Sequence, residues 1–362
     1  MKTMKNWMTF ILLVCCSTVY GQYHALETPQ ASPKINETQR IGLTDITVNY
    51  HAPAVRGRKV WEGLVPFNGN PVPWRAGANI NTTIAFSTDV MIEGKPLAAG
   101  SYGFHTIPSD GEWELIFASN DNLWGSYYLD LEKEVALRVK VKTETAPMRE
   151  YMSFEFMNRT DNAITVALEW EKLRVPFEVA VDLNKTVVES FRYQLRGHTT
   201  NSWAAWDAAA QWCLGQDTNL EEALTWAERS INGGFGGFRA DKNLTNLGTK
   251  ASILWKLGRK EESDKILDEA IALGNDPNAM FNLGRTVLVQ ERKEKSLQIF
   301  QAAVDKFPNT WYVHLGHSRA LSANGAYKKA VKSIDLALKG APDNYKAYLN
   351  GLKDKLQKNE PI

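Results

Sequence analysis

The sequence has few cysteines, almost no net charge and no long apolar run. Its 362 residues include 3 cysteines and carry a formal net charge of +1 at pH 7. A nucleic-acid-binding protein normally shows a basic stripe, whereas lysine and glutamate are interspersed here, so we predict no nucleic-acid partner. The apolar stretch Trp7–Val14 is too short to cross a bilayer as a stable helix. We therefore predict no membrane span.

Sequence motifs for catalysis and metal binding are also missing. The chain contains no Gly-x-Ser-x-Gly, His-Glu-x-x-His or Cys-x-x-Cys pattern. His314 and His317 share a helix face, but zinc needs more ligands than two, and we interpret them as packed residues. The sequence thus gives nucleophilic catalysis little support, and we predict neither a cofactor nor a metal.

The first residues have the pattern of a secretory signal. Lys2 and Lys5 precede the apolar stretch Trp7–Val14, and small residues follow near Gly21. We predict cleavage before Gln22, which leaves residues 1–21 as a signal peptide. The mature protein is then exported, to the periplasm or the outside of the cell.

The cysteine pair near this signal leaves a lipoprotein as the alternative. The residue before a lipidated cysteine is usually Gly, Ala or Ser, but Val14 precedes Cys15 and Cys15 precedes Cys16. We therefore favour simple cleavage. Only Cys213 then remains, so no intramolecular disulfide forms, and its helical surroundings predict a buried thiol.

Period-two alternation predicts an N-terminal antiparallel β-sandwich over residues 41–182, after a flexible leader at 22–40. Turn signals such as Glu93–Lys95 separate the runs, and no helical period lies between them. We place an edge or a bend at Pro176. The alternating residues are Ile46/Val48/Tyr50, Thr83 to Phe86, Tyr102 to Ile107, Trp113/Leu115/Phe117, Leu137/Val139/Val141, Met152/Phe154/Phe156, Ile164/Val166/Leu168/Trp170 and Val175/Phe177/Val179/Val181.

The stretch Val55–Phe86 concentrates arginine, tryptophan and proline, and it carries a specific family resemblance. The matching blocks are GRKVWEGLVPF, WRAGAN with TTIAF, GKPLAAGSYGFHTIP, EWELIFASNDNLWGSYY and ALRVKVK. Together they resemble DUF2911, a family of exported bacterial proteins without an assigned biochemical role. The resemblance covers roughly Ser32–Val181. This sequence departs from the family pattern at Asn68–Pro73, and at Ile80-Asn81, where an acidic residue is expected.

Five residues of this region form the first candidate ligand site. Arg75 is suited to clamp a carboxylate or phosphate, Trp61 and Trp124 to stack on a sugar, and His105 titrates near neutrality; Asn79 completes the set. The structural alternative is that Trp61 and Trp74 plug one end of the sandwich while Arg75 and Asn79 hold loop carbonyls. An enzymatic alternative, a hydrolase or carbohydrate-active enzyme, requires His105, Arg75 and an acidic residue to converge in one pocket.

From residue 183 the hydrophobic period becomes helical. We predict a linking helix over 183–199 and helical repeats over 200–358, closed by a C-terminal cap helix. Pro308 and Pro342 lie 34 residues apart, as do Ser296 and Ala330, and Ser263 precedes Ser296 by 33. This period, with its small and large core positions, resembles the tetratricopeptide repeat.

The concave face of the repeats is the second candidate site. Mixed aromatic and arginine side chains suit an extended peptide or a partner segment, and the register predicts five of them there: Trp255, Phe281, Arg285, Tyr312 and Arg319. The alternative is an array that only packs against the sandwich.

We therefore predict a two-domain β + α protein, an antiparallel β-sandwich followed by a helical solenoid. It is interpreted as an exported binding or scaffolding protein of the cell envelope. The predicted partners are a protein or peptide on the repeats and a carbohydrate or other small ligand on the sandwich.

Overall fold

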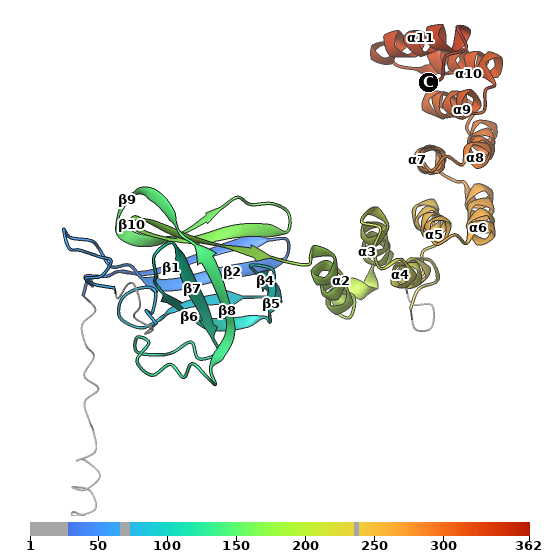
Figure 1. The fold of residues 1–362 in the computed structure, drawn as a ribbon. Coiled ribbons are helices and arrows are strands. Elements are labelled where there is room, and N and C mark those ends of the chain that lie inside the picture. The colour runs from blue at the N-terminus through green and yellow to red at the C-terminus, as the bar shows by residue number, and fades with distance from the viewer. Residues whose placement is uncertain (1–27, 66–72, 235–238) are drawn as a thin grey trace, which may run out of the picture. The chain divides into compact units, whose positions relative to one another are not determined.

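A computed structural model describes residues 28–65, 73–234 and 239–362. The chain divides into two compact units, residues 1–181 and 182–362, which are drawn as ribbons in Figure 1. The predicted signal peptide, most of the Asn68–Pro73 departure and part of the glycine-rich segment after Asn232 lie outside the described residues. No helix of the described ranges is long and apolar enough to span a bilayer.

The N-terminal unit consists of two antiparallel sheets. One sheet has six strands in the order β1-β2-β3-β6-β7-β8, and the other has four in the order β5-β4-β10-β9. The strands are β1 (Lys34–Ile41), β2 (Thr44–His51), β3 (Thr82–Phe86), β4 (Val90–Ile92), β5 (Lys95–Leu97), β6 (Gly100–Ile107), β7 (Glu112–Ala118), β8 (Val135–Lys142), β9 (Glu144–Met157) and β10 (Ala163–Ala180).

The alternation of the sequence places one face of each sheet in a shared core. Along β2, Ile46, Val48 and Tyr50 are buried, while the residues between them are half-buried. The rings of Phe104 and Phe177, from β6 and β10, stack at 5.6 Å. Side chains of both sheets therefore fill one core, and the predicted antiparallel sandwich is confirmed.

Strand β1 corrects the predicted leader. Residues 34–41 are not a flexible segment, because they pair with β2 along its whole length, from Lys34 opposite His51 to Ile41 opposite Thr44. β1 lies at the sheet edge and only Ile41 is buried in it. The inner face of β1 is only half-buried and carries Glu37 and Gln39 between Ile35 and Ile41. These polar residues interrupt the hydrophobic alternation, which is why the sequence pattern missed the strand.

A predicted turn at Glu93–Lys95 and a predicted edge or bend at Pro176 both lie where the sequence placed them. Glu93 and Gly94 connect β4 to β5 with φ values of 48° and 73°. Positive φ at both central residues is the requirement of a type I′ hairpin turn. Pro176 lies within β10, between the part that pairs with β9 and the part that pairs with β4. The missing N–H of proline therefore falls where the strand changes partner.

The C-terminal unit is built of antiparallel helix pairs after an initial helix. Each pair buries a stripe of apolar residues against the next, in a chain of neighbouring clusters. The helices are α2 (Leu183–Gln194), α3 (Trp203–Gly215), α4 (Leu220–Asn232), α5 (Leu244–Lys256), α6 (Lys260–Leu273), α7 (Pro277–Val289), α8 (Lys293–Lys306), α9 (Trp311–Ala323), α10 (Tyr327–Gly340) and α11 (Asp343–Gln357).

Small residues let the two helices of each pair approach closely. The hydroxyl of Ser296 on α8 donates to the carbonyl of Gly284 on α7 at 2.8 Å, and Ser263 on α6 makes the same bond to α5. In the next pair the direction is reversed, because Ser318 on α9 donates to the carbonyl of Ala330 on α10. Each of these three pairs thus keeps one buried serine hydroxyl at the crossing, on one helix or the other.

Candidate functional site

Four tryptophans from separate segments pack together at one end of the sandwich. Trp61 makes edge contacts with Trp74 at 6.3 Å, Trp113 at 5.3 Å and Trp170 at 5.8 Å between ring centroids. Trp74 also stacks on Trp170 and pairs its backbone with Thr106 of β6. Trp61 is therefore packed among aromatic rings, as the structural alternative of the sequence analysis described.

His105 is fully buried in β6 beside this cluster. Its Nδ1 lies 2.8 Å from the Ser126 hydroxyl, and burial lowers the pKa of the imidazole to about 4. The ring is therefore uncharged near neutrality. His105 holds Ser126 in place from the core side and does not itself reach the solvent.

A pocket of about 410 Å³ opens beside the tryptophan cluster. Arg75 and Ser126 line it with Trp74 and Trp170, whereas Asn79 and Trp124 do not belong to its lining. The Asn79 amide instead donates to Gln30, and Trp124 is 62% exposed. The structure thus brings Arg75 and the Ser126–His105 pair together and leaves Trp124 apart from them.

The condition of the enzymatic alternative is not met by the described residues. His105 is buried outside the pocket lining, and no aspartate or glutamate is among the described residues that line the pocket with Arg75. General acid–base catalysis needs a titrating group within reach of a substrate. This arrangement supports binding better than hydrolysis.

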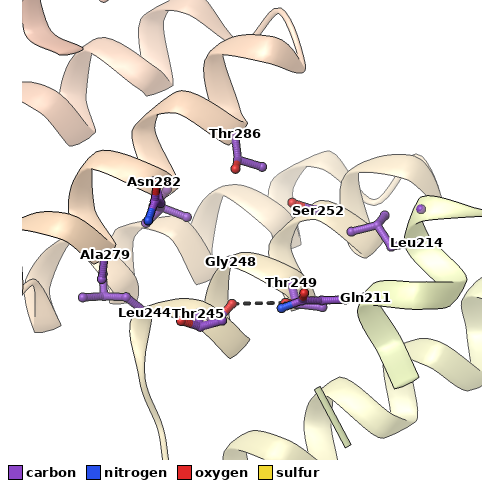
Figure 2. A pocket seen from close by; sticks show the side chains of 12 residues that line it. Gln211, Leu214, Leu244, Thr245, Gly248, Thr249, Ser252, Ala279, Asn282 and Thr286 are labelled. Carbon is purple, nitrogen blue, oxygen red and sulfur yellow. Dashed lines mark hydrogen bonds between the residues drawn. The ribbon is translucent and has the colours of Figure 1, made fainter. Parts of the chain in front are cut away.

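A second pocket, of about 390 Å³, lies on the helical repeats. It is lined by residues of α3, α5 and α7, and none of them is charged (Figure 2). The lining residues are Gln211, Leu214, Gly215, Leu244, Thr245, Gly248, Thr249, Ser252, Ala279, Asn282, Leu283 and Thr286. We call this pocket the α3–α5–α7 groove.

Some polar groups of the groove are held by hydrogen bonds within the chain, and others are free to bind a ligand. The Gln211 Nε2 donates to Asp207 at 2.7 Å and to Thr249 at 3.3 Å, so its carbonyl oxygen stays available as an acceptor. Asp207 is buried, which raises the pKa of its carboxyl. Asn282 and Thr286 are exposed on α7 and point into the groove in Figure 2.

The aromatic residues predicted for the concave face are engaged in packing. The Phe281 ring contacts Phe300 at 5.9 Å and Tyr312 at 5.7 Å. The guanidinium of the buried Arg292 lies 4.1 Å above the ring of Trp255. These rings join successive helices and do not line the α3–α5–α7 groove.

The two predicted arginines differ in their surroundings. Arg285 is exposed on α7, next to the groove residue Thr286. Arg319 on α9 donates to the Tyr348 hydroxyl of α11 at 2.7 Å and so connects the last repeat to the cap helix. The sequence register placed both one repeat apart, but it could not show that only one of them has such a contact.

His314 and His317 have the packing role that the sequence analysis preferred. His314 Nε2 contacts the Pro308 carbonyl at 2.6 Å, and His317 Nδ1 contacts the Ser333 hydroxyl at 3.1 Å. Burial lowers the pKa of His317 to about 4. Across the described ranges, no group of three or more His, Cys, Asp or Glu side chains could hold a metal ion.

Comparison with family models gives one match in each unit of the chain. Residues 32–179 match the family described as "Protein of unknown function (DUF2911)". Residues 245–275, which cover α5 from its second residue, α6 and the connection between them, match the tetratricopeptide repeat. Both resemblances found in the sequence are confirmed. A search of curated proteins gives no match.

Several solved tetratricopeptide repeat structures are similar to parts of the chain. A MamA fragment from Desulfovibrio magneticus is 18% identical with a TM-score of 0.28, and the match covers 43% of this chain and 88% of the fragment. A repeat protein from Parabacteroides merdae is 17% identical with a TM-score of 0.31, covering 49% and 71%. YrrB, a repeat protein with an unusual peptide-binding site, is 15% identical with a TM-score of 0.29, covering 48% and 86%. Scores this low transfer no function to this chain.

Proposed function

The chain joins a DUF2911 region to tetratricopeptide repeats, and from this premise we propose that it is an exported protein-binding or scaffolding protein of the cell envelope. The repeats are its partner-binding part. The partner contributes an extended, largely uncharged segment that lies in the α3–α5–α7 groove.

The observation that supports this proposal is the chemistry of the groove. Its exposed side chains are amides and hydroxyls, from Gln211, Thr245, Asn282 and Thr286, and its walls are apolar or small. Amides and hydroxyls both donate and accept hydrogen bonds, so they can satisfy the N–H and C=O groups of an extended main chain. A groove without charge favours a segment without charge.

Peptide selection tests this proposal on the full chain. A displayed library of 12-residue peptides is panned against the protein, and the affinities of enriched peptides are measured by fluorescence polarisation. We expect Thr286→Arg to weaken binding at least tenfold, because the long side chain occupies the groove.

The matched control is Thr225→Arg, which makes the same change at an exposed position of α4 outside the groove. Its affinity should equal that of the unchanged protein. Peptides that bind equally well to the Thr286→Arg variant would place the binding surface elsewhere and contradict the proposal.

Export is the second part of the proposal, and the sequence before Gln22 supports it. Mass spectrometry of the protein purified from the envelope should find a mature N-terminus at or near Gln22. An intact Met1 in that fraction would contradict cleavage, and a diacylglyceryl adduct on Cys15 or Cys16 would identify a lipoprotein instead.

A further inference from the structure

The guanidinium group of Arg75 lines the sandwich pocket without a partner. No described residue forms a hydrogen bond or ion pair with it, and its Nε–H is buried. A buried donor left unsatisfied costs about 1–3 kcal/mol, and more when the group is charged. Such a group in a native fold needs an explanation, and a bound acceptor provides one.

Arg58, the other arginine of the pocket, differs from Arg75 because its guanidinium has partners within the chain. Arg58 also lines the pocket, but its Nε donates to the Val55 carbonyl at 3.1 Å and its Nη2 to the Ala54 carbonyl at 2.5 Å. Arg58, rather than Arg75, therefore holds loop carbonyls. Arg58 adds positive charge, while the donors of Arg75 stay free for a ligand.

The loop after Leu123 positions this free group. Gly125 has a φ of 69°, and a Cβ built there would lie 2.9 Å from Nη1 of Arg75. The glycine thus allows the loop backbone to lie directly against the guanidinium. The next residue, Ser126, also lines the pocket, and its hydroxyl lies 2.8 Å from Nδ1 of the buried His105.

We propose that this pocket binds a small ligand through a carboxylate or phosphate group, with the planar fork of Arg75 as its main partner. Two arginines and no aspartate or glutamate are among the described lining residues, so the pocket attracts an anion. The faces of Trp74, Trp170 and Pro53 provide an apolar wall for the body of the ligand. The volume of about 410 Å³ suits a molecule of the size of a monosaccharide.

Calorimetric titration of the full chain tests the proposal with three probes: glucuronate, inorganic phosphate, and glucose as the neutral counterpart of glucuronate. We expect one of the anions to bind and glucose to bind at least tenfold more weakly. Binding of glucuronate alone identifies a carboxylate ligand, and binding of phosphate identifies a phosphate ligand.

Substitutions identify the pocket. Arg75→Met should weaken anion binding at least tenfold without lowering the melting temperature, because no described residue depends on this guanidinium. Arg40→Met removes an arginine whose partner is Asp45, outside the pocket, and should leave the affinity unchanged. If Arg75→Met does not fold, Arg75→Lys gives the same comparison, since an ammonium keeps the charge but loses the fork. Equal affinity in the folded Arg75 variant, or no anion binding by the unchanged protein, would overturn the proposal.

Discussion

Phe300→Ala is expected to destabilise residues 182–362 by about 3–5 kcal/mol and to leave residues 32–181 unaffected. The Phe300 ring is buried between α7 and α9, where a Cβ at Gly284 or Gly316 would lie 2.6 Å or 2.0 Å from it. Because helix backbones enclose the ring on both sides, the cavity left by alanine cannot collapse. The loss is a large part of the 5–15 kcal/mol that usually stabilises a folded protein.

Hydrogen exchange followed by mass spectrometry measures this effect separately in each unit. The matched control is Tyr193→Ala on α2, which removes a ring that is 81% exposed and should change stability by less than about 0.5 kcal/mol. If Phe300→Ala also speeds exchange in β2 or β6, the two units unfold together and are not independent.

Trp113→Ala is expected to destabilise the other unit, residues 32–181, by about 3–5 kcal/mol and to leave residues 182–362 unaffected. Trp113 on β7 is fully buried and packs against Trp61 and Trp74, which close one end of the sandwich. Removing the ring leaves a cavity under Trp74, a wall of the pocket that contains Arg75.

Urea titration monitored by hydrogen exchange gives the free energy of unfolding of this unit. Trp124→Ala is the control within the unit, because Trp124 is 62% exposed and its loss should cost less than about 0.5 kcal/mol. A comparable cost for the two substitutions would mean that the tryptophan cluster does not determine stability.

The sequence predicted the parts of the fold that depend on repeated burial. Ile46, Val48 and Tyr50 alternate because one face of β2 is buried, and the 34-residue spacing of Ser296 and Ala330 reflects equivalent helix crossings. β1 was missed because its inner face is only half-buried and carries the polar Glu37 and Gln39. Periodicity reports burial, so it cannot identify an edge strand that buries little.

The candidate sites were harder to predict. Contacts within the fold decide which side chains are left free to bind a ligand, and the sequence does not show these contacts. Arg58 and Arg75 look alike in sequence, yet only Arg58 donates to carbonyls of the chain. Trp255 and Phe281 seemed suited to a partner but contact other helices. Thr245 and Thr286 line the groove, and their residue type and spacing give no signal in the sequence.

The most direct test of the proposed function is hydrogen exchange of the full chain with and without a selected peptide. We predict slower exchange in α3, α5 and α7, around Gln211, Thr249 and Asn282, and unchanged exchange in the sandwich. Protection confined to α8–α10 or to the β-strands would contradict binding in the α3–α5–α7 groove.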